Sequence, residues 1–481
     1  MKNTLNKFFL KYHLLLILFA GLLFRVLFYF FGAKIYYGNN DFFVGGDTWG
    51  WVSSIQNLID HGTYSIIIGE PNGYFFRPPG YSFFIGIFYL LSGKNIDLTY
   101  QLVIYAQILL DVAAIWLIYN IVLKFSENKI WAALSALLYT FYPFIIVWTP
   151  VVYAESSSVF FVLMGLWIFV NEKIRYNYFW SGLFFGFAAL FRLQIVFFFP
   201  SILLAITINY WNNIYALLKK ALPFTLAFIL SYGLWPARNL ILHDRVLFTQ
   251  DLSTMDCWDV DYMGFMDYIF SVKTDYEPQY SQIIKGGENV EWPKASYIIP
   301  EDSAKLARVT KMCHDCGRGF NIFIKNEGFT PAIITNENTC SPEIARMWSE
   351  LKENQVYYNS LNYFLFVPLS NLKKSLLKTS LYSPANKVVN LVSTILFGYR
   401  SLMLFIGFLG LIFYWRVNKR FPMALKIILF YFVSWYFWNS FVYRNMEMRY
   451  LIQADLLFLI WAAYAILYFV EIITKRKLLT P

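Results

Sequence analysis

Residues 39–91 read NNDFFVGGDTWGWVSSIQNLIDHGTYSIIIGEPNGYFFRPPGYSFFIGIFYLL, and this stretch decides how the rest of the chain is interpreted. Gly45-Gly46 forms a flexible turn before Asp47. The apolar residues after Asp47 recur with the spacing of one helical face, and His61-Gly62 ends that helix. The pattern places Asp47 at a helix N-terminus, where its carboxylate is either a plain helix cap or a reactive group.

The second half of the stretch predicts a turn and another helix. Arg77-Pro78-Pro79-Gly80 indicates an extended turn, and the apolar run Tyr81–Leu91 follows it. Counting this run as a membrane span would invert the topology of everything after it. We therefore expect interfacial helices in the first outer loop.

The composition is that of a membrane protein. The 481 residues are 58% hydrophobic, 21% aromatic and 15% charged, whereas a soluble chain is about half apolar and about a quarter charged. The formal net charge of +10 does not indicate a nucleic-acid partner, because the basic residues fall in short loops rather than in one patch. We expect an all-α polytopic membrane protein in contact with membrane lipids.

Apolar runs predict about ten transmembrane helices. The predicted spans cover residues 12–32, 101–123, 130–149, 154–170, 178–191, 193–209, 220–236, 396–415, 422–440 and 450–471. Residues 178–209 could instead form one long tilted or broken helix. The N-terminus resembles a signal peptide, but no small-residue cleavage site follows, so we interpret it as an uncleaved first span.

The distribution of Lys and Arg sets the orientation. Short segments that contain at least two basic residues alternate with segments that contain almost none. The basic segments are residues 1–11, 124–129, 171–178, 211–220, 416–420 and 475–477. By the positive-inside rule these segments are cytoplasmic. The prediction is a multi-pass inner-membrane protein with both termini in the cytoplasm and an extracytoplasmic active site.

Three parts of the chain are expected: residues 1–236 form an N-terminal membrane module that includes the first outer loop (33–100), residues 237–392 form a small exoplasmic loop domain, and residues 393–481 form the C-terminal membrane helices. All the cysteines, Cys257, Cys313, Cys316 and Cys340, fall in the loop domain. This favours disulfides, although the sequence does not choose their pairing. Alternatively, Cys313-His-Asp-Cys316 is half a zinc site or a redox dithiol.

Ionisable residues from distant parts of the sequence are predicted at the outer membrane face. They are Asp41, Asp47, Arg77, Glu155, Arg192, Arg238, Arg444, Glu447 and Arg449, with Tyr450 beside the last. Arginine binds phosphate with two parallel hydrogen bonds, and a carboxylate removes a proton from a hydroxyl or holds a metal. Each residue alone is compatible with a snorkelling arginine or a helix cap. As a set they suit an anionic, lipid-borne substrate.

Arg25 and Asp111 lie at similar depth inside two predicted spans. We expect them to form a structural ion pair.

Several short motifs occur in an order that resembles a known family. GGDTWGW, FRPPGYSFF, FYP…YAESS, ALFR, LWPARN and EMRY follow one another along the membrane part. This order resembles the GT-C superfamily of membrane glycosyltransferases, and most of all its bacterial branch of protein-mannosyltransferase-like and aminoarabinose-transferase-like enzymes.

The resemblance implies a sugar donor on a polyprenyl or dolichyl phosphate and inverting transfer on the extracytoplasmic face. It implies that Asp47 is the catalytic base, that Glu155 supports the site or a divalent cation, and that Arg444 and Arg449 hold the donor phosphate. No cofactor is certain.

The sequence thus predicts a hexosyl or pentosyl transferase that acts on a hydroxyl of a glycan, lipid or protein. Arg77, Arg192 and Arg238 are further candidates for phosphate binding, and Asp41, Glu447 and Tyr450 are supporting residues. The alternative is a membrane transporter or lipid flippase, but such folds usually show inverted repeats and broken helices at mid-membrane, whereas here no repeat is visible and the polar groups cluster at one face.

Overall fold

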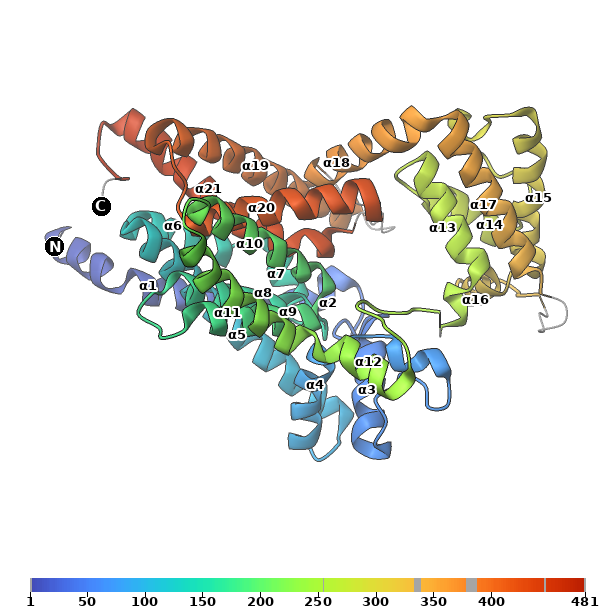
Figure 1. Cartoon of the computed structure of the whole chain (residues 1–481), viewed down its shortest axis with the longest axis horizontal. Helices are drawn as coiled ribbons and strands as arrows, with labels where there is room; N and C mark the ends of the chain where they lie inside the picture. Colours follow the sequence, from blue (N-terminus) through green and yellow to red (C-terminus); the bar gives the residue numbers. More distant parts are fainter. Residues whose placement is uncertain (1, 254, 333–338, 378–386, 445–446, 480–481) are drawn as a thin grey trace.

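A computed structural model describes residues 2–253, 255–332, 339–377, 387–444 and 447–479, which form helices and no strands (Figure 1). The helices are α1 (Lys2–Leu27), α2 (Ala33–Tyr37), α3 (Thr48–His61), α4 (Pro79–Leu91), α5 (Ile96–Ser126), α6 (Lys129–Thr140), α7 (Pro143–Trp148), α8 (Ala154–Val170), α9 (Asn177–Phe191), α10 (Phe198–Tyr210), α11 (Ile214–Tyr232), α12 (Leu234–His243), α13 (Val260–Val272), α14 (Glu277–Ile284), α15 (Pro300–Cys316), α16 (Arg318–Asn326), α17 (Ser341–Tyr358), α18 (Val367–Leu377), α19 (Lys387–Asn418), α20 (Met423–Phe437) and α21 (Met448–Thr474).

The membrane part is confirmed as a multi-pass helical bundle. Seven helical stretches of the described chain are long and apolar enough to cross a membrane. They are Tyr12–Tyr37, Ile96–Ser126, Leu193–Tyr210, Ile214–Tyr232, Asn390–Asn418, Met423–Tyr443 and Met448–Thr474. The remaining predicted spans coincide with shorter helices: α6 followed by α7, then α8, then α9. The count of ten spans therefore goes beyond what helix length alone supports.

Residues 178–209 form two helices that turn back at Arg192 rather than one long helix, because Tyr178 near the start of α9 and Tyr210 at the end of α10 both lie beside Lys220, with ring centroids 4.5 and 4.9 Å from its Nζ. Helix α9 ends at Phe191, and Arg192 has an extended backbone with φ −144° and ψ 120°. A short 3-10 turn over Leu193–Phe197 then leads into α10. The break places Arg192 at a bundle end rather than inside a continuous helix.

Local sequence explains where several helices begin. An asparagine precedes α5, α6 and α11, and in each case its side-chain oxygen accepts a hydrogen bond from the backbone N–H three residues later. The pairs are Asn95 with Leu98 at 3.0 Å, Asn128 with Trp131 at 2.8 Å and Asn213 with Ala216 at 3.0 Å. Asparagine is among the best N-cap residues.

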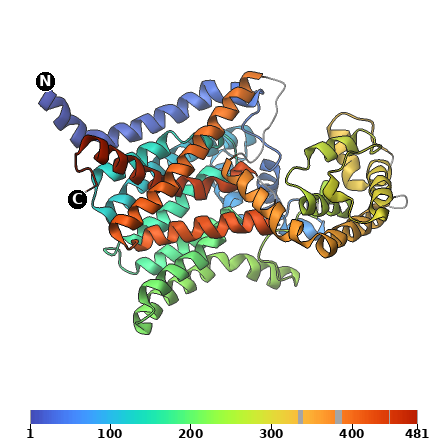
Figure 2. The ribbon, with the colours of Figure 1, turned by 90° about the horizontal axis from the view of Figure 1, so that it is seen from above.

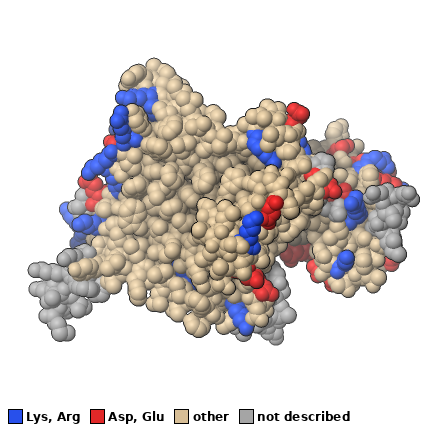
Figure 3. Space-filling model, turned by 90° about the horizontal axis from the view of Figure 1, so that it is seen from below, with Lys and Arg blue, Asp and Glu red and all other residues tan. Residues whose placement is uncertain are grey.

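Both termini lie at one end of the bundle, and helices α13–α17 extend from the other end (Figures 1 and 2). The surface between the two ends carries few charges, whereas Lys and Arg gather near the termini and both signs of charge occur on α13–α17 (Figure 3). This arrangement suits a bundle whose sides face lipid.

The predicted ion pair between Arg25 and Asp111 is confirmed. Arg25 on α1 donates its Nε–H to Asp111 on α5, and both side chains are fully buried. Tyr139 also donates to Asp111. A second buried pair joins Arg400 on α19 to Asp455 on α21 at 2.6 Å. The sequence analysis missed this pair, although both charges lie inside predicted spans.

The first outer loop contains two helices, α3 and α4, that pack on each other. Helix α4 buries Tyr81 and Ile85 but leaves Ile87 and Leu91 exposed by 56% and 72%. An exposed apolar face on a short helix beside a membrane bundle is typical of an interfacial helix.

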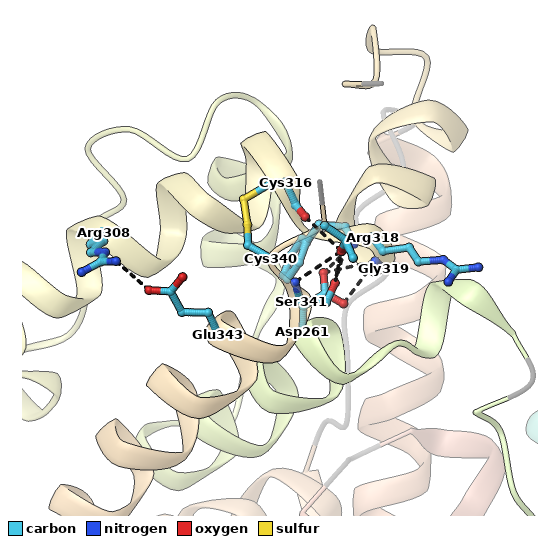
Figure 4. Close-up of a disulfide and its surroundings, with 10 residues drawn as sticks. Asp261, Arg308, Cys316, Arg318, Gly319, Cys340, Ser341 and Glu343 are labelled. Carbon is cyan, nitrogen blue, oxygen red and sulfur yellow. Dashed lines mark hydrogen bonds and ion pairs between the residues drawn. A yellow bond between two sulfur atoms is a disulfide. The ribbon is translucent and has the colours of Figure 1, made fainter. Parts of the chain in front are cut away.

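Helices α13–α17 surround a hydrophobic core of their own, which includes Phe265 and Trp348. A disulfide joins Cys316 at the end of α15 to Cys340 (Figure 4). The predicted disulfide chemistry is thus confirmed for one pair, and the redox-dithiol interpretation of Cys313 and Cys316 is wrong because Cys316 is bonded to Cys340.

The carboxylate of Asp261 lies beside this disulfide and accepts hydrogen bonds from the backbone N–H groups of Gly319 at 3.1 Å and Phe320 at 3.3 Å (Figure 4). It therefore satisfies the N-terminus of α16. Burial raises the pKa of Asp261 and outweighs these hydrogen bonds.

Candidate functional site

Asp47 occupies the N-cap position of α3, as predicted, but its side chain makes no capping hydrogen bond. Its Oδ1 instead accepts a hydrogen bond from Nη2 of Arg77 at 2.9 Å, and its Oδ2 accepts one from Nη1 of Arg449. The carboxylate therefore accepts hydrogen bonds from two arginines rather than from the backbone N–H groups of α3.

The backbone around Asp47 is fixed to the loop that precedes α8. The N–H of Asp47 donates to Oη of Tyr153 at 3.1 Å. Thr48 donates its hydroxyl to the carbonyl of Val152 at 3.1 Å, and the N–H of Val152 donates to the carbonyl of Phe43 at 2.9 Å. A Cβ on Gly45 would lie 2.2 Å from Oη of Tyr153. Glycine at position 45 thus permits the close contact that joins the first and second outer loops.

An ion pair and a shared aromatic ring connect Glu447 and Arg192 to Arg449, the partner of Asp47. Arg449 donates its Nε–H to Glu447 at 2.5 Å. The guanidinium carbons of Arg192 and Arg449 lie 5.7 and 5.2 Å from the centroid of the Tyr450 ring. Tyr450 thus keeps two cations near one another.

Glu155, in the first turn of α8, faces Arg192 at the break after α9. Their charged atoms are 2.9 Å apart, and both side chains are buried. This contact is not an aligned hydrogen bond: both carboxylate oxygens of Glu155 and the Nε and Nη2 groups of Arg192 have no hydrogen-bond partner in the described part of the chain. Buried guanidinium N–H groups in this condition are available to an anion.

Arg77 is held by aromatic rings and one amide. Its guanidinium carbon lies 4.8 Å from the Trp51 ring, and its Nη1 donates to Gln250 at 3.1 Å. Its Nε, like that of Arg192, is buried without a partner among the described residues. We call the set of Asp47, Arg77, Glu155, Arg192, Glu447, Arg449 and Tyr450 the Asp47 cluster.

The electrostatics of the cluster favour the ionised form of Asp47. Burial opposes ionisation, but the charges of Arg449 and Arg77 outweigh it and lower the pKa of Asp47 below its usual value. Burial and the Asp47 charge raise the pKa of Tyr153 to about 12. At neutral pH the site therefore contains an aspartate anion beside a protonated phenol.

The other predicted site residues lie outside the cluster. Arg238 donates to the backbone carbonyls of Tyr74 at 2.8 Å and Tyr64 at 2.9 Å. Arg444 donates to the carbonyls of Phe441, Phe270 and Tyr363. These contacts are those of residues that hold loops together.

Asp41 is exposed, and no ion pair involves its side chain in the described part of the chain.

A cavity of about 180 Å³ adjoins the cluster. Its wall is mostly apolar and aromatic, with two charged residues at one side. The lining residues are Tyr36, Phe144, Val147, Trp148, Ser393, Phe397, Glu447, Met448 and Arg449. The sequence analysis did not predict this cavity or the role of Tyr153; the only signal for Tyr153 was its position two residues before Glu155.

The residues present do not form a cation site. Asp47 and Glu155 each face an arginine, and the described residues contain no group of three or more His, Cys, Asp and Glu side chains placed to hold a metal.

Comparison with known proteins gives one family match and similarity to solved structures. Residues 76–235 match the family of dolichyl-phosphate-mannose-protein mannosyltransferases. No curated protein sequence matches the chain significantly. A crystal structure of the Archaeoglobus fulgidus oligosaccharyltransferase tethered to an acceptor peptide is 14% identical, with a TM-score of 0.52, and covers 98% of this chain.

A second structure, the Archaeoglobus fulgidus oligosaccharyltransferase AglB with an inhibitory peptide and a dolichol-phosphate, is 12% identical with a TM-score of 0.50 and covers 97% of this chain. The chain spans only about half of these proteins, 51% and 52% of their lengths. A third structure is ArnT from Cupriavidus metallidurans bound to undecaprenyl phosphate, which is 12% identical to this chain. The alignment covers 87% of this chain and 73% of ArnT, but the TM-score of 0.29 is too low to indicate a shared fold.

These matches agree with the resemblance that the motif order indicated: the chain has the fold of the Archaeoglobus fulgidus oligosaccharyltransferase. Residues 76–235, a third of the chain, match the model of the dolichyl-phosphate-mannose-protein mannosyltransferases.

Proposed function

We propose that this protein transfers a sugar from a polyprenyl or dolichyl phosphate to an acceptor hydroxyl at the outer face of the membrane. The observation that carries the proposal is the Asp47 cluster, in which a carboxylate and three arginines meet beside a mostly apolar cavity at a bundle end. Buried N–H groups of Arg77 and Arg192 have no partner among the described residues. That combination suits a phosphate attached to a lipid.

The fold supports the same assignment. The oligosaccharyltransferase that shares this fold was solved with a dolichol-phosphate, and the matched family is named for its dolichyl-phosphate-mannose donor. Because the chain spans about half of the structural relatives, their acceptors do not carry over. The acceptor here is a hydroxyl of a glycan, lipid or protein.

In the proposed reaction the donor phosphate binds between Arg449, Arg192 and Arg77, and the adjoining apolar wall contacts the lipid chain. Asp47 accepts the proton of the acceptor hydroxyl while the acceptor oxygen forms a bond to the anomeric carbon. The bond from that carbon to the phosphate oxygen breaks, with inversion, and the electron pair leaves with the phosphate. The arginines stabilise the charge that develops on it.

The proposed topology has ten membrane-crossing segments, with α6 followed by α7, α8 and α9 as short crossings. Both termini lie in the cytoplasm, and the Asp47 cluster and α13–α17 lie outside. The basic loops near the termini support this orientation.

The donor sugar is identified first, by glycan and lipid analysis of a strain that lacks the gene. Release of polyprenyl phosphate from that lipid-linked sugar is then measured with the purified protein in nanodiscs. Asparagine caps a helix about as well as aspartate but is not a base, so Asp47→Asn should fold normally and lower turnover at least about 100-fold.

Asp41→Asn is the control, because it removes an exposed acid from the same loop and should retain near wild-type turnover. Full activity of Asp47→Asn would rule out its role as the base. Movement of the lipid across the bilayer without release of polyprenyl phosphate would favour the transporter or flippase alternative.

A further inference from the structure

Asp47, the proposed base, is paired with an arginine through each of its carboxylate oxygens. Nη2 of Arg77 donates to Oδ1 and Nη1 of Arg449 donates to Oδ2. A carboxylate that accepts charge-assisted hydrogen bonds on both oxygens is a weak proton acceptor, because both bonds favour its charged form. Loss of one of these arginines would therefore make Asp47 a stronger base.

Arg449 donates hydrogen bonds to three different side chains. Its Nε donates to Glu447 at 2.5 Å, its Nη1 donates to Asp47, and its Nη2 donates to Oη of Tyr450 at 3.4 Å. An incoming phosphate can bind the Nη edge of this guanidinium only by displacing Asp47. Glu447 remains on the opposite edge and keeps the side chain in place.

Arg192 and Arg77 differ from Arg449 in their hydrogen bonding. Arg192 and Arg77 have buried N–H groups that no described residue accepts, and the Tyr450 ring lies close to both Arg192 and Arg449. A phosphate attracted to the unsatisfied N–H groups would therefore arrive next to Arg449. Its charge would compete directly with that of Asp47.

We propose that the donor phosphate takes Arg449 from Asp47, so that Asp47 opposes donor binding in the free protein and becomes an available base only in the donor complex. This inference rests on the proposed function and adds an order of events: the donor binds before an acceptor can be deprotonated. An acceptor that arrives first meets a carboxylate whose proton affinity is still lowered by both arginines.

Binding of undecaprenyl monophosphate to the full-length protein in nanodiscs tests the proposal without knowledge of the sugar. Asp47→Asn removes the competing charge, so this variant should bind the lipid about tenfold more tightly than the wild type, a difference equivalent to about 1.4 kcal/mol. Asp41→Asn should leave the affinity unchanged, although it removes the same charge from the same loop.

Equal or weaker binding by Asp47→Asn would overturn the competition, and so would equal tightening by Asp41→Asn, which would indicate a general effect of charge. Both results would leave the proposed glycosyl transfer standing. Absence of binding in every folded variant would instead contradict the proposed donor class. If Asp47→Asn does not fold, Asp47→Ser, which also retains a capping side chain, takes its place with the same expected result.

Discussion

The surroundings of Arg444 and Arg449 determine which of these two arginines is available to a phosphate. Both belong to the motif YRNMEMRY, and both were predicted to hold the donor phosphate. Arg444 has a left-handed backbone with φ 62° and turns its guanidinium toward three backbone carbonyls. Arg449 lies in the first turn of α21 and faces two carboxylates. We therefore propose that Arg449, and not Arg444, binds the donor phosphate.

Alanine substitutions separate the two roles. Arg449→Ala should weaken binding of undecaprenyl monophosphate by about one to two decades, because a hydrogen bond to a charged group contributes about 1.5–3 kcal/mol. Arg444→Ala should lower stability and leave lipid affinity near that of the wild type. Lipid affinity measured on the folded fraction of each variant checks this, and equal losses in both variants would contradict the assignment.

The depressed pKa of Asp47 predicts a pH dependence with a definite sign. Its ordinary value is 3.8, and the folded-state pKa is lower. The stability that this carboxylate contributes is therefore fully present above its ordinary pKa and is lost as the pH falls through its folded-state pKa.

The wild type and Asp47→Asn should accordingly differ in thermal midpoint by a constant amount at about pH 5–8 and converge only below about pH 4. Thermal unfolding in detergent across this range measures the difference. Convergence that begins near pH 6 would show that Asp47 is not paired as described.

At the scale of helices, the buried pair of Arg25 and Asp111 joins α1 to α5. Removal of one partner leaves an unpaired charge in an apolar interior, which is more destabilising than removal of both. Asp111→Asn should therefore lower the yield of folded protein more than the double variant Arg25→Leu/Asp111→Leu. Size-exclusion chromatography of detergent extracts gives the yields, and equal losses would argue against a coupled pair.

Periodicity and charge predicted much at this scale. The helix start at Asp47, the helices α3 and α4 and the ion pair of α1 with α5 all follow from patterns within short segments or from equal depth in two spans. Arg400 and Asp455 also lie within two predicted spans, so opposite charges in apolar helices indicated this second pair as well. For residues 178–209 the sequence left two spans and one long tilted or broken helix open, and the structure shows two helices that turn back at Arg192.

The candidate site was harder to predict than the helices. Sequence patterns placed its residues at one membrane face but did not show which of them meet. Tyr153 belongs to the site because it contacts Gly45, so that the first and second outer loops meet there. Arg238 does not belong to it, because its guanidinium donates to backbone carbonyls. Such choices depend on how loops pack, and no local pattern encodes that.

At the scale of the whole molecule, the proposed topology makes a labelling prediction. Ser156 is fully buried and unsuitable for a thiol probe, whereas Asp41 and Glu127 are exposed at positions expected on opposite sides. An impermeant maleimide added to intact cells should label Asp41→Cys above the background of the parent protein and should label Glu127→Cys only after permeabilisation. Labelling of Glu127→Cys in intact cells would exclude the proposed orientation.

The two buried ion pairs also bear on how the protein is made. In each pair the arginine is synthesised first: Asp111 follows Arg25 by 86 residues, and Asp455 follows Arg400 by 55. An arginine at the centre of a lone helix costs about 2.5–3.5 kcal/mol during insertion. We therefore expect α1 and α19 to carry an uncompensated charge in the bilayer until α5 and α21 are made, so that each pair forms only after its second helix has been inserted.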